Sequence, residues 1–276
     1  MEIQLWRDAG AVTLEREHRS GRSADVWVGS LNGDEVAVKI YRPTFDDGGF
    51  FDESVDREAE VACTDAKVVT PLGRGVVHYS GERWGHVLVF PYIDAVCIND
   101  VVKSGILEES GPRAKLAVAN NLISSLSSLH ECGWIHGDIA PSNILVSEDD
   151  WSVHLIDLEF CLPTGVTFDD KSHRGTPGYT APEIDECGVI ASSFKSDVWS
   201  LGWVLAEIFN PDDVPPERDW LGHMKEHGSS RSMLNGWTSG MEGGIDAAVR
   251  KCVIIPRAER VMLSEIKEVF ETNVRH

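Results

Sequence analysis

Residues 136–145 read HGDIAPSNIL and place a carboxylate, Asp138, five positions before an amide, Asn143. Two short apolar runs follow, ILV and WSVHLID, and the acidic segment SEDD between them predicts a hairpin that ends near Asp157. A loop that carries an acid and a neutral amide suits a reaction that needs a proton acceptor and an oxygen ligand for a metal ion. An aspartate in a turn, bonded to its own backbone, explains the same residues without any chemistry.

The part of the chain before this loop has the pattern of a β-sheet. The strand-like runs DVWVGS, EVAVKIY and HVLVFPYI are separated by turn residues, and the pair Asn32-Gly33 predicts a tight hairpin between the first two. The alternation in EVAVKIY predicts two opposite faces, one with Val36, Val38 and Ile40 and the other with Ala37, Lys39 and Tyr41.

The part around and after the loop has helical periodicity. Apolar residues between Leu116 and Leu129 recur on one stripe, which predicts an amphipathic helix. The run SDVWSLGWVLAEIF predicts a second helix, with one apolar side made of Val198, Leu201, Leu205 and Ile208. We therefore expect an α+β fold with a β-rich N-lobe that includes one helix (1–92), a mainly helical C-lobe (93–276), and the chemistry in a cleft between them.

The composition is that of a folded protein of enzyme size. The chain has 276 residues, of which 42% are apolar and 25% charged. Its formal net charge of −20 repels nucleic acid and anionic membranes, so neither is an expected partner. The six cysteines form no CxxC pair, and no run approaches about 18 apolar residues, so we expect no zinc site, no disulfide framework and a cytoplasmic location. The sequence does not indicate the oligomeric state.

Several segments together resemble the eukaryotic-type protein kinase family. RGTPGYTAPE (174–183) is similar to the segment that closes the family's activation loop, and HGDIAPSN is similar to its catalytic loop, HRDLKPEN. With EVAVKIY and the helix from Ser196, the resemblance covers about residues 15 to 270. It implies a bilobal kinase-like fold, the cofactors ATP and Mg²⁺, and transfer of the γ-phosphoryl group to serine or threonine hydroxyls of a protein substrate.

The resemblance assigns roles to the charged residues. Lys39 corresponds to the lysine that contacts the α- and β-phosphates, and Glu58 corresponds to the helix glutamate that holds this lysine. Asp138 corresponds to the aspartate that accepts the proton of the substrate hydroxyl. Asn143 and Asp157 correspond to the two metal ligands.

The resemblance also implies a nucleotide pocket and two structural ties. Nucleotide contacts are expected from Gly21, Val26, Ala37, Lys39, Phe90, Tyr92 and Ile93. Asp197 is expected to bind the backbone of the catalytic loop, and Arg260 is expected to form a buried ion pair with Glu183.

Four positions depart from the family pattern. The glycine-rich loop is reduced to RSGRSADV (19–26), which predicts a weak phosphate cradle. Gly137 replaces the arginine that docks a phosphorylated activation loop, so the chain is of the non-RD type and loop phosphorylation is not its expected switch. Ala140 replaces a lysine near the γ-phosphate, which predicts slow catalysis. Glu159 replaces the glycine of DFG, and with HGD it resembles the aminoglycoside phosphotransferase and choline kinase branch.

Two other functions stay open at the level of the sequence. A small-molecule phosphotransferase is favoured by HGD (136–138) and DLE (157–159). The segment GTPGYTAPE (175–183) opposes it. A pseudokinase scaffold is favoured by the degenerate glycine-rich loop and Ala140, whereas the presence of Lys39, Asp138 and Asp157 opposes it.

Overall fold

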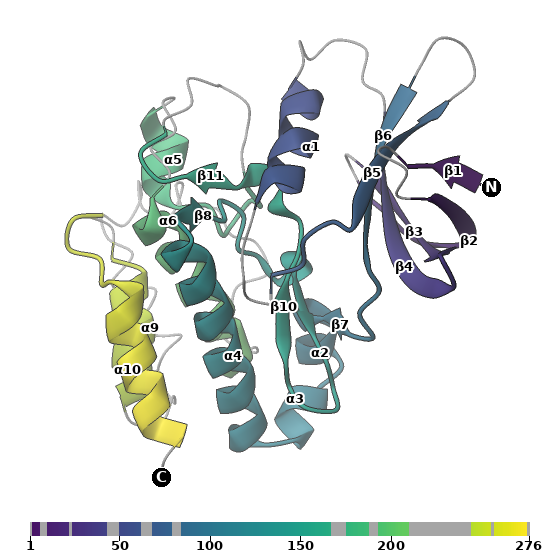
Figure 1. Ribbon diagram of the computed structural model, residues 1–276. Helices are drawn as coiled ribbons and strands as arrows, with labels where there is room; N and C mark the ends of the chain where they lie inside the picture. Colours follow the sequence, from purple (N-terminus) through teal and green to yellow (C-terminus); the bar gives the residue numbers. More distant parts are fainter. Residues whose placement is uncertain are drawn as a thin grey trace. The chain divides into compact units, whose positions relative to one another are not determined.

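The fold is described from a computed structural model of the chain (Figure 1). The structure describes residues 2–5, 10–21, 24–42, 50–61, 68–78, 84–166, 175–187, 193–209, 244–254 and 257–274. The chain divides into two compact units, and each is described by itself. The first unit comprises Met1–Ala62 and Val69–Asp94, and the second comprises Cys63–Val68 and Ala95–His276. The first unit thus ends two residues after the predicted limit of the N-lobe at residue 92.

The first unit is an antiparallel sheet with one helix. The strands lie in the order β1-β2-β3-β4-β6-β5 (Figure 1). The elements are β1 (Glu2–Gln4), β2 (Ala11–Ser20), β3 (Ala24–Leu31), β4 (Asp34–Tyr41), α1 (Phe50–Glu60), β5 (Gly73–His78) and β6 (Trp84–Pro91).

The hairpin between β3 and β4 forms where the sequence predicts it. Asn32 and Gly33 have positive φ angles of 56° and 96°, as expected for the two central residues of a tight primed turn. The turn places Leu31 opposite Asp34 and fixes the register along the rest of the hairpin, so that Val26 lies opposite Lys39.

The two faces of β4 differ in burial, as the alternation predicts. One face contributes to the hydrophobic core of this unit, which consists of Ile3, Leu5, Val12, Leu14, Leu31, Val36, Val38, Ile40, Val77, Val87 and Val89. On the other face Ala37 and Lys39 are half-buried, whereas Tyr41 at the end of the strand is buried. Because directly paired residues share a face of a sheet, Val26 and Leu88, which pair with Lys39, and Phe90, which pairs with Ala37, belong to this second face.

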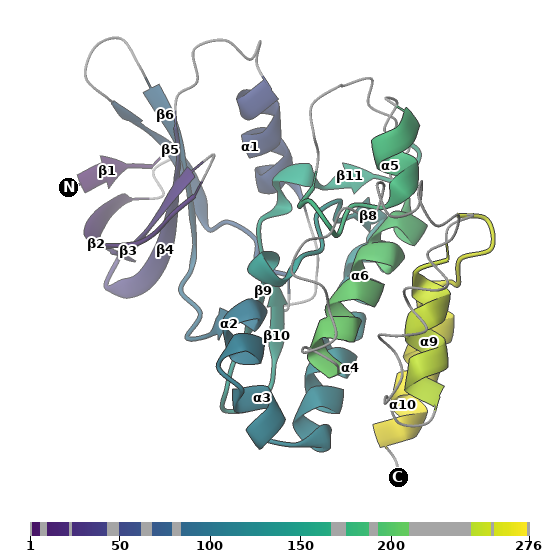
Figure 2. The ribbon, with the colours of Figure 1, turned by 180° about the vertical axis from the view of Figure 1, so that it is seen from behind.

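The second unit is mainly helical, with three short antiparallel strand pairs (Figures 1 and 2). Its elements are β7 (Val96–Cys97), α2 (Ile98–Lys103), α3 (Ile106–Glu109), α4 (Pro112–Glu131), β8 (Trp134–Ile135), η2 (Pro141–Asn143), β9 (Ile144–Val146), β10 (Val153–Leu155), η3 (Leu158–Phe160), β11 (Leu162–Pro163), α5 (Pro182–Cys187), α6 (Phe194–Phe209), α9 (Gly244–Cys252) and α10 (Leu263–Val274). Helix α4 packs against α6 and α10, and α9 packs against the same two helices.

The two long helices differ in how they are buried. Helix α4 is amphipathic as predicted, and it ends before Gly133, whose φ of 82° lies in the left-handed region that favours glycine. The prediction of one apolar side for α6 was incomplete, because this helix is buried on nearly every side. The rings of Trp199 and Trp203, both on this helix, pack edge to face at a centroid distance of 6.0 Å.

These elements confirm the predicted α+β class, with a β-rich N-terminal unit and a mainly helical C-terminal unit. Within the residues that the structure describes, no helix has the length and apolar character needed to span a bilayer.

Candidate active site

The loop HGDIAPSN (136–143), which is the expected catalytic loop, lies between two short strand pairs of the second unit. It follows β8, which pairs with β11, and it ends in η2 just before the β9–β10 hairpin. The amide of Ile156 donates to the carbonyl of Asn143 at 3.1 Å. This contact brings the end of the hairpin, and therefore Asp157, back to the end of the loop.

Asp138 and Asn143 form direct hydrogen bonds. The Nδ2 group of Asn143 donates to Oδ2 of Asp138 at 2.7 Å and to the carbonyl oxygen of Asp138 at 3.0 Å. The other end of the amide, Oδ1, accepts a hydrogen bond from the hydroxyl of Ser142 at 3.1 Å. The amide therefore uses its donor end to orient the acid, and its oxygen keeps a second lone pair for a cation.

The environment of Asp138 favours its protonated form. Burial raises the pKa of this carboxyl above its ordinary value, and the negative charge of Asp157 acts in the same direction. The side chain of Thr176, the charge of His136 and the hydrogen bond from Asn143 oppose the shift. A carboxyl whose pKa is raised is a stronger base than one in water, as a group that accepts a proton in catalysis requires.

Asp197 anchors the loop, as predicted from the sequence. Its carboxylate accepts hydrogen bonds from the backbone N–H groups of His136, at 2.8 Å, and Gly137, at 2.9 Å. It also lies 2.9 Å from Nε2 of His130, whose ring stacks on Phe194. Because Asp197 lies in the first turn of the buried helix α6, these bonds fix the loop to the core of the second unit.

Gly137 lies where a side chain has no space. Its φ is 79°, and a Cβ atom built on it would lie 2.6 Å from the carbonyl oxygen of Phe160. The turn after Asp157 thus approaches the catalytic loop so closely that this position requires glycine. This contact gives a physical reason for the absence of the family's arginine.

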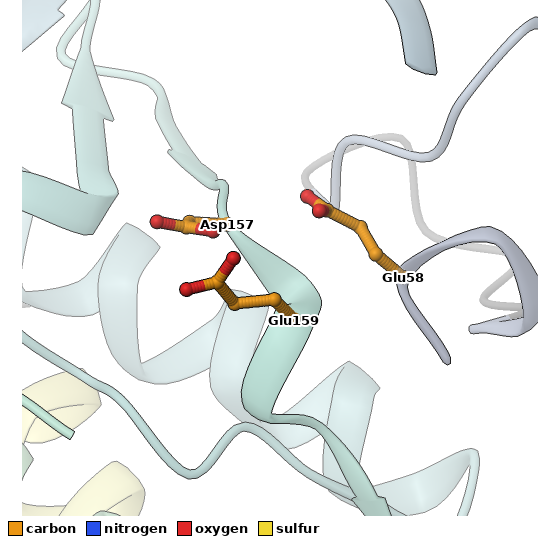
Figure 3. A group of neighbouring side chains, drawn as sticks. All are labelled: Glu58, Asp157 and Glu159. Carbon is orange, nitrogen blue, oxygen red and sulfur yellow. The ribbon is translucent and has the colours of Figure 1, made fainter. Parts of the chain in front are cut away.

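Two carboxylates lie side by side at the turn after β10. Asp157 has a φ of 64°, a left-handed conformation that is uncommon for aspartate. Figure 3 shows its side chain next to that of Glu159, which projects from η3 on the same side of the turn. One carboxylate oxygen of Asp157 and one carboxylate oxygen of Glu159 lie within 4.8 Å of each other. Hard oxygen ligands at this separation suit a divalent cation such as Mg²⁺.

In the first unit the structure brings Lys39 and Glu58 together. Nζ of Lys39 donates to Oε2 of Glu58 at 2.9 Å. The side chain of Glu58 is 1% exposed and that of Lys39 is 11% exposed, so the pair is shielded from water. Such a pair holds an ammonium group in one position.

Most of the residues predicted to contact the nucleotide belong to the sheet of the first unit. Val26, Ala37, Lys39 and Phe90 lie on the same face of the sheet, as their register requires. Gly21 follows β2 directly, and its amide donates to the carbonyl of Ala24 at 2.9 Å.

Tyr92 and Ile93 follow directly after β6, and both are half-buried. The amide of Tyr92 donates to the carbonyl of Glu35 at 3.4 Å.

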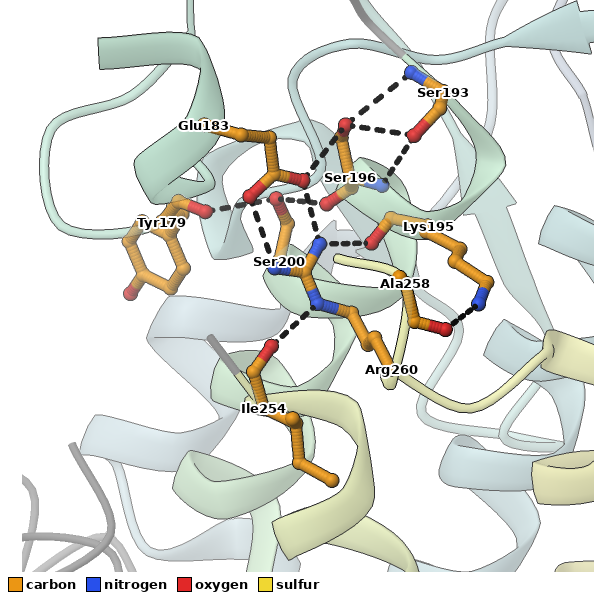
Figure 4. Close-up of polar contacts among 9 residues, drawn as sticks. All are labelled: Tyr179, Glu183, Ser193, Lys195, Ser196, Ser200, Ile254, Ala258 and Arg260. Atoms are coloured by element: carbon orange, nitrogen blue, oxygen red, sulfur yellow. Dashed lines mark hydrogen bonds and ion pairs between the residues drawn. The ribbon is translucent and has the colours of Figure 1, made fainter. Parts of the chain in front are cut away.

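The predicted ion pair forms at the end of GTPGYTAPE (175–183), between a buried arginine and a half-buried glutamate (Figure 4). Arg260 binds Glu183 in a bidentate manner, with Nη1–Oε1 at 2.7 Å and Nη2–Oε2 at 2.9 Å. The guanidinium also donates to the carbonyls of Ile254 at 3.1 Å and Lys195 at 2.6 Å. It lies 5.0 Å from the centroid of the Trp199 ring.

Three residues that contact the predicted functional groups were missed by the sequence analysis, two in the second unit and one in the first. Thr176 contributes to the environment of Asp138, and His130 binds Asp197. Tyr41 donates a hydrogen bond to Glu58. Only Tyr41 had a signal in the sequence, because the alternation in β4 places it on the face of Lys39.

Comparisons with known proteins identify a family and relatives of the chain. The model of the protein kinase domain family matches residues 20–234. The serine/threonine-protein kinase PknE of Mycobacterium tuberculosis is 30% identical over 202 residues, which cover 70% of this chain and 33% of PknE. The LRR receptor-like serine/threonine-protein kinase EFR of Arabidopsis thaliana is 34% identical over 152 residues, which cover 50% of this chain and 14% of EFR. The serine/threonine-protein kinase RUNKEL, also of Arabidopsis thaliana, is 42% identical over 96 residues, which cover 33% of this chain and 7% of RUNKEL. The matched regions span a third or less of the length of these relatives.

Proposed function

Because the chain belongs to the protein kinase domain family, we propose that it transfers the γ-phosphoryl group of ATP to serine or threonine hydroxyls of a protein substrate. The names of the relatives support this acceptor, since PknE, EFR and RUNKEL are all serine/threonine-protein kinases. We propose further that the protein acts in the cytoplasm and does not act on nucleic acid, as its net charge of −20 favours.

The observation that carries the proposal is the arrangement around Asp138. Its carboxylate is buried, its pKa is raised, and Asn143 holds it through a hydrogen bond of 2.7 Å. In this role Asp138 accepts the proton of the substrate hydroxyl as the oxygen attacks the phosphorus atom. Asp197 supports this role indirectly, because it accepts hydrogen bonds from the backbone N–H groups of the two residues before Asp138.

The donors near the loop fit a magnesium ion. Asn143 offers an amide oxygen, and Asp157 and Glu159 offer neighbouring carboxylates. We propose that Asn143 and Asp157 hold Mg²⁺, with Glu159 as an additional acidic group of the same turn. Bound magnesium neutralises charge on the phosphates of ATP.

Lys39 has the corresponding role in the first unit. We propose that its ammonium contacts the α- and β-phosphates and that Glu58 keeps it in place for this contact. The sheet face with Val26, Ala37 and Phe90 would pack against the nucleotide. Ala140 supplies no cation near the γ-phosphate, so we expect turnover to be slow.

A small-molecule phosphotransferase is the second candidate. Gly137 and Glu159 favour it, because both depart from the protein kinase pattern in the same direction. The ion pair of Arg260 and Glu183 opposes it, because it stabilises a segment whose expected role is to support a peptide substrate.

Incubation with γ-labelled ATP and Mg²⁺ separates the candidates. The acceptors are a mixture of casein and histone in one set of reactions, and an aminoglycoside or choline in another. The proposal predicts label on phosphoserine or phosphothreonine of the proteins. Label on the small alcohols alone would establish the second candidate. If no acceptor is labelled and MgATP does not raise the melting temperature, the chain is a scaffold rather than an enzyme.

A further inference from the structure

Glu58 has a second hydrogen-bond donor besides Lys39. The hydroxyl of Tyr41 donates to Oε2 of Glu58, the same oxygen that accepts the bond from Lys39. Lys39 and Tyr41 lie two positions apart on β4, whereas Glu58 comes from α1. The three side chains therefore join the strand to the helix within the first unit.

The burial of these groups makes the second donor important. Tyr41 and Glu58 are each 1% exposed. A buried carboxylate that loses a donor loses more stability than an exposed one, because water does not replace the missing bond. If Lys39 turns toward another anion, such as a phosphate, the hydroxyl of Tyr41 still provides a hydrogen bond to the buried carboxylate of Glu58.

Tyr41 also contacts Lys39. Nζ of Lys39 lies 4.8 Å from the centroid of the Tyr41 ring, within the range of a cation–π interaction. The ring of Tyr41 thus limits the movement of the Lys39 ammonium, and its hydroxyl limits the movement of the Glu58 carboxylate.

From these contacts we propose that Tyr41 is a positioning residue: it holds Glu58 in place independently of Lys39, so that the Lys39–Glu58 pair is assembled before nucleotide binds. This inference rests on the proposed function for the role of Lys39, but its structural content does not depend on activity. Control of this pair would then need no modification of the activation loop, in agreement with the glycine at position 137.

The first test is amide hydrogen exchange of the nucleotide-free chain. Tyr41→Phe removes the hydroxyl and keeps the ring. We expect faster exchange in α1, while exchange in β2 and β3 stays as in the wild type. Lys39→Met should leave α1 protected, and the double variant Tyr41→Phe with Lys39→Met should lose this protection. Unchanged exchange in α1 of Tyr41→Phe, or an equal increase in every element, would overturn the proposal.

A matched control removes a buried hydroxyl elsewhere. Ser127 in α4 donates to the carbonyl of Ile123 at 2.8 Å, and Ser127→Ala should leave exchange in α1 unchanged. A change in α1 exchange in this variant as large as that in Tyr41→Phe would show that loss of any buried hydroxyl has the effect, and would also overturn the proposal.

The second test is kinetic. For Tyr41→Phe we expect kcat/KM for ATP to fall by about tenfold, the scale of a hydrogen bond to a charged group. In a Glu58→Gln background the same substitution should have no further effect, because the two residues act through one carboxylate. A full additional loss in that background would overturn the proposal. If the wild type phosphorylates no acceptor, the proposed function fails, and hydrogen exchange alone decides the role of Tyr41.

Discussion

Nδ2 of Asn143 donates a hydrogen bond to Oδ2 of Asp138 at 2.7 Å. The oxygen of the same amide, Oδ1, does not take part in this bond. One side chain thus orients the acid and keeps its amide oxygen available as a neutral ligand for the proposed metal ion. A carboxylate at position 143 can serve the metal but cannot donate to Asp138.

Asn143→Asp tests this division of roles. Two carboxylates at hydrogen-bond distance share one proton, so the pKa of the pair moves further up and less base is available at neutral pH. We expect kcat at pH 7 to fall by about a hundredfold and the acid limb of the pH–kcat profile to move to higher pH.

Ser142→Ala provides the control for that experiment. It removes the hydroxyl that donates to Asn143 and leaves the bond between Asn143 and Asp138 intact. Its acid limb should coincide with that of the wild type. An acid limb of Asn143→Asp that stays at the wild-type position would contradict the role assigned to the amide.

The raised pKa of Asp138 has a consequence for stability. The folded chain keeps a proton on this carboxyl at pH values where the unfolded chain has released it. Stability is therefore lost as the pH rises from the ordinary value of 3.8 through the raised value in the folded state. We expect Asp138→Asn to have a higher free energy of unfolding than the wild type at pH 7, and the difference should shrink as the pH falls toward the ordinary pKa of 3.8. Urea denaturation at several pH values measures it.

Asp150→Asn is a control of opposite sign. The backbone N–H of Ser152 donates to Asp150 at 2.9 Å and lowers the pKa of this exposed carboxyl. Its contribution is present above the ordinary pKa and is lost as the pH falls through the lowered one. Asp150→Asn should therefore never exceed the wild type in stability.

The comparison at pH 7 decides the role of Asp138 burial. If the wild type is at least as stable as Asp138→Asn at this pH, burial of Asp138 does not lower the free energy of unfolding.

Gly137→Ala measures the close approach of the loop at residues 136–143 to the turn after Asp157. A left-handed φ costs a non-glycine residue about 1 to 2 kcal/mol, and the contact with the carbonyl of Phe160 adds to this cost. Gly165 has a φ of 84° and nothing within 4 Å of a built Cβ, so Gly165→Ala includes only the first term. Chemical denaturation should show a clearly larger loss for Gly137→Ala, whereas equal losses would mean that the turn moves away freely.

The ion pair of Arg260 and Glu183 should be mainly structural. Arg260→Met leaves a half-buried carboxylate without its partner and should lower the free energy of unfolding by roughly 3 to 5 kcal/mol. Arg260→Lys keeps the charge and loses the bidentate geometry, so we expect an intermediate loss. In a Glu183→Gln background the effect of Arg260→Met should be smaller, which a double-mutant cycle in urea detects. Additive effects would contradict direct coupling of the pair.

The sequence predicted features that depend on local rules. Asn32-Gly33 specified its turn because only a few residues accept positive φ at both positions. The ion pair of Arg260 and Glu183 was expected from two motifs of the family. Both predictions required residue types whose chemistry leaves few alternatives.

Other features depend on contacts between distant segments. Tyr41 reaches Glu58 across 17 positions, and alternation along one strand does not show which helix covers it. The contact of Gly137 with Phe160 depends on how tightly a turn folds back, which the sequence shows only as the absence of an arginine. The burial of α6 on nearly every side was missed because periodicity identifies one packed side and not the others.

The turnover of Asp138→Asn, measured together with its affinity for MgATP, tests the central claim most directly. The account predicts that kcat falls by at least about a hundredfold while the Kd for MgATP stays at the wild-type value. Asp157→Ala in the same assay should instead weaken MgATP binding. Wild-type turnover in Asp138→Asn would contradict the assignment of Asp138 as the group that accepts the substrate proton.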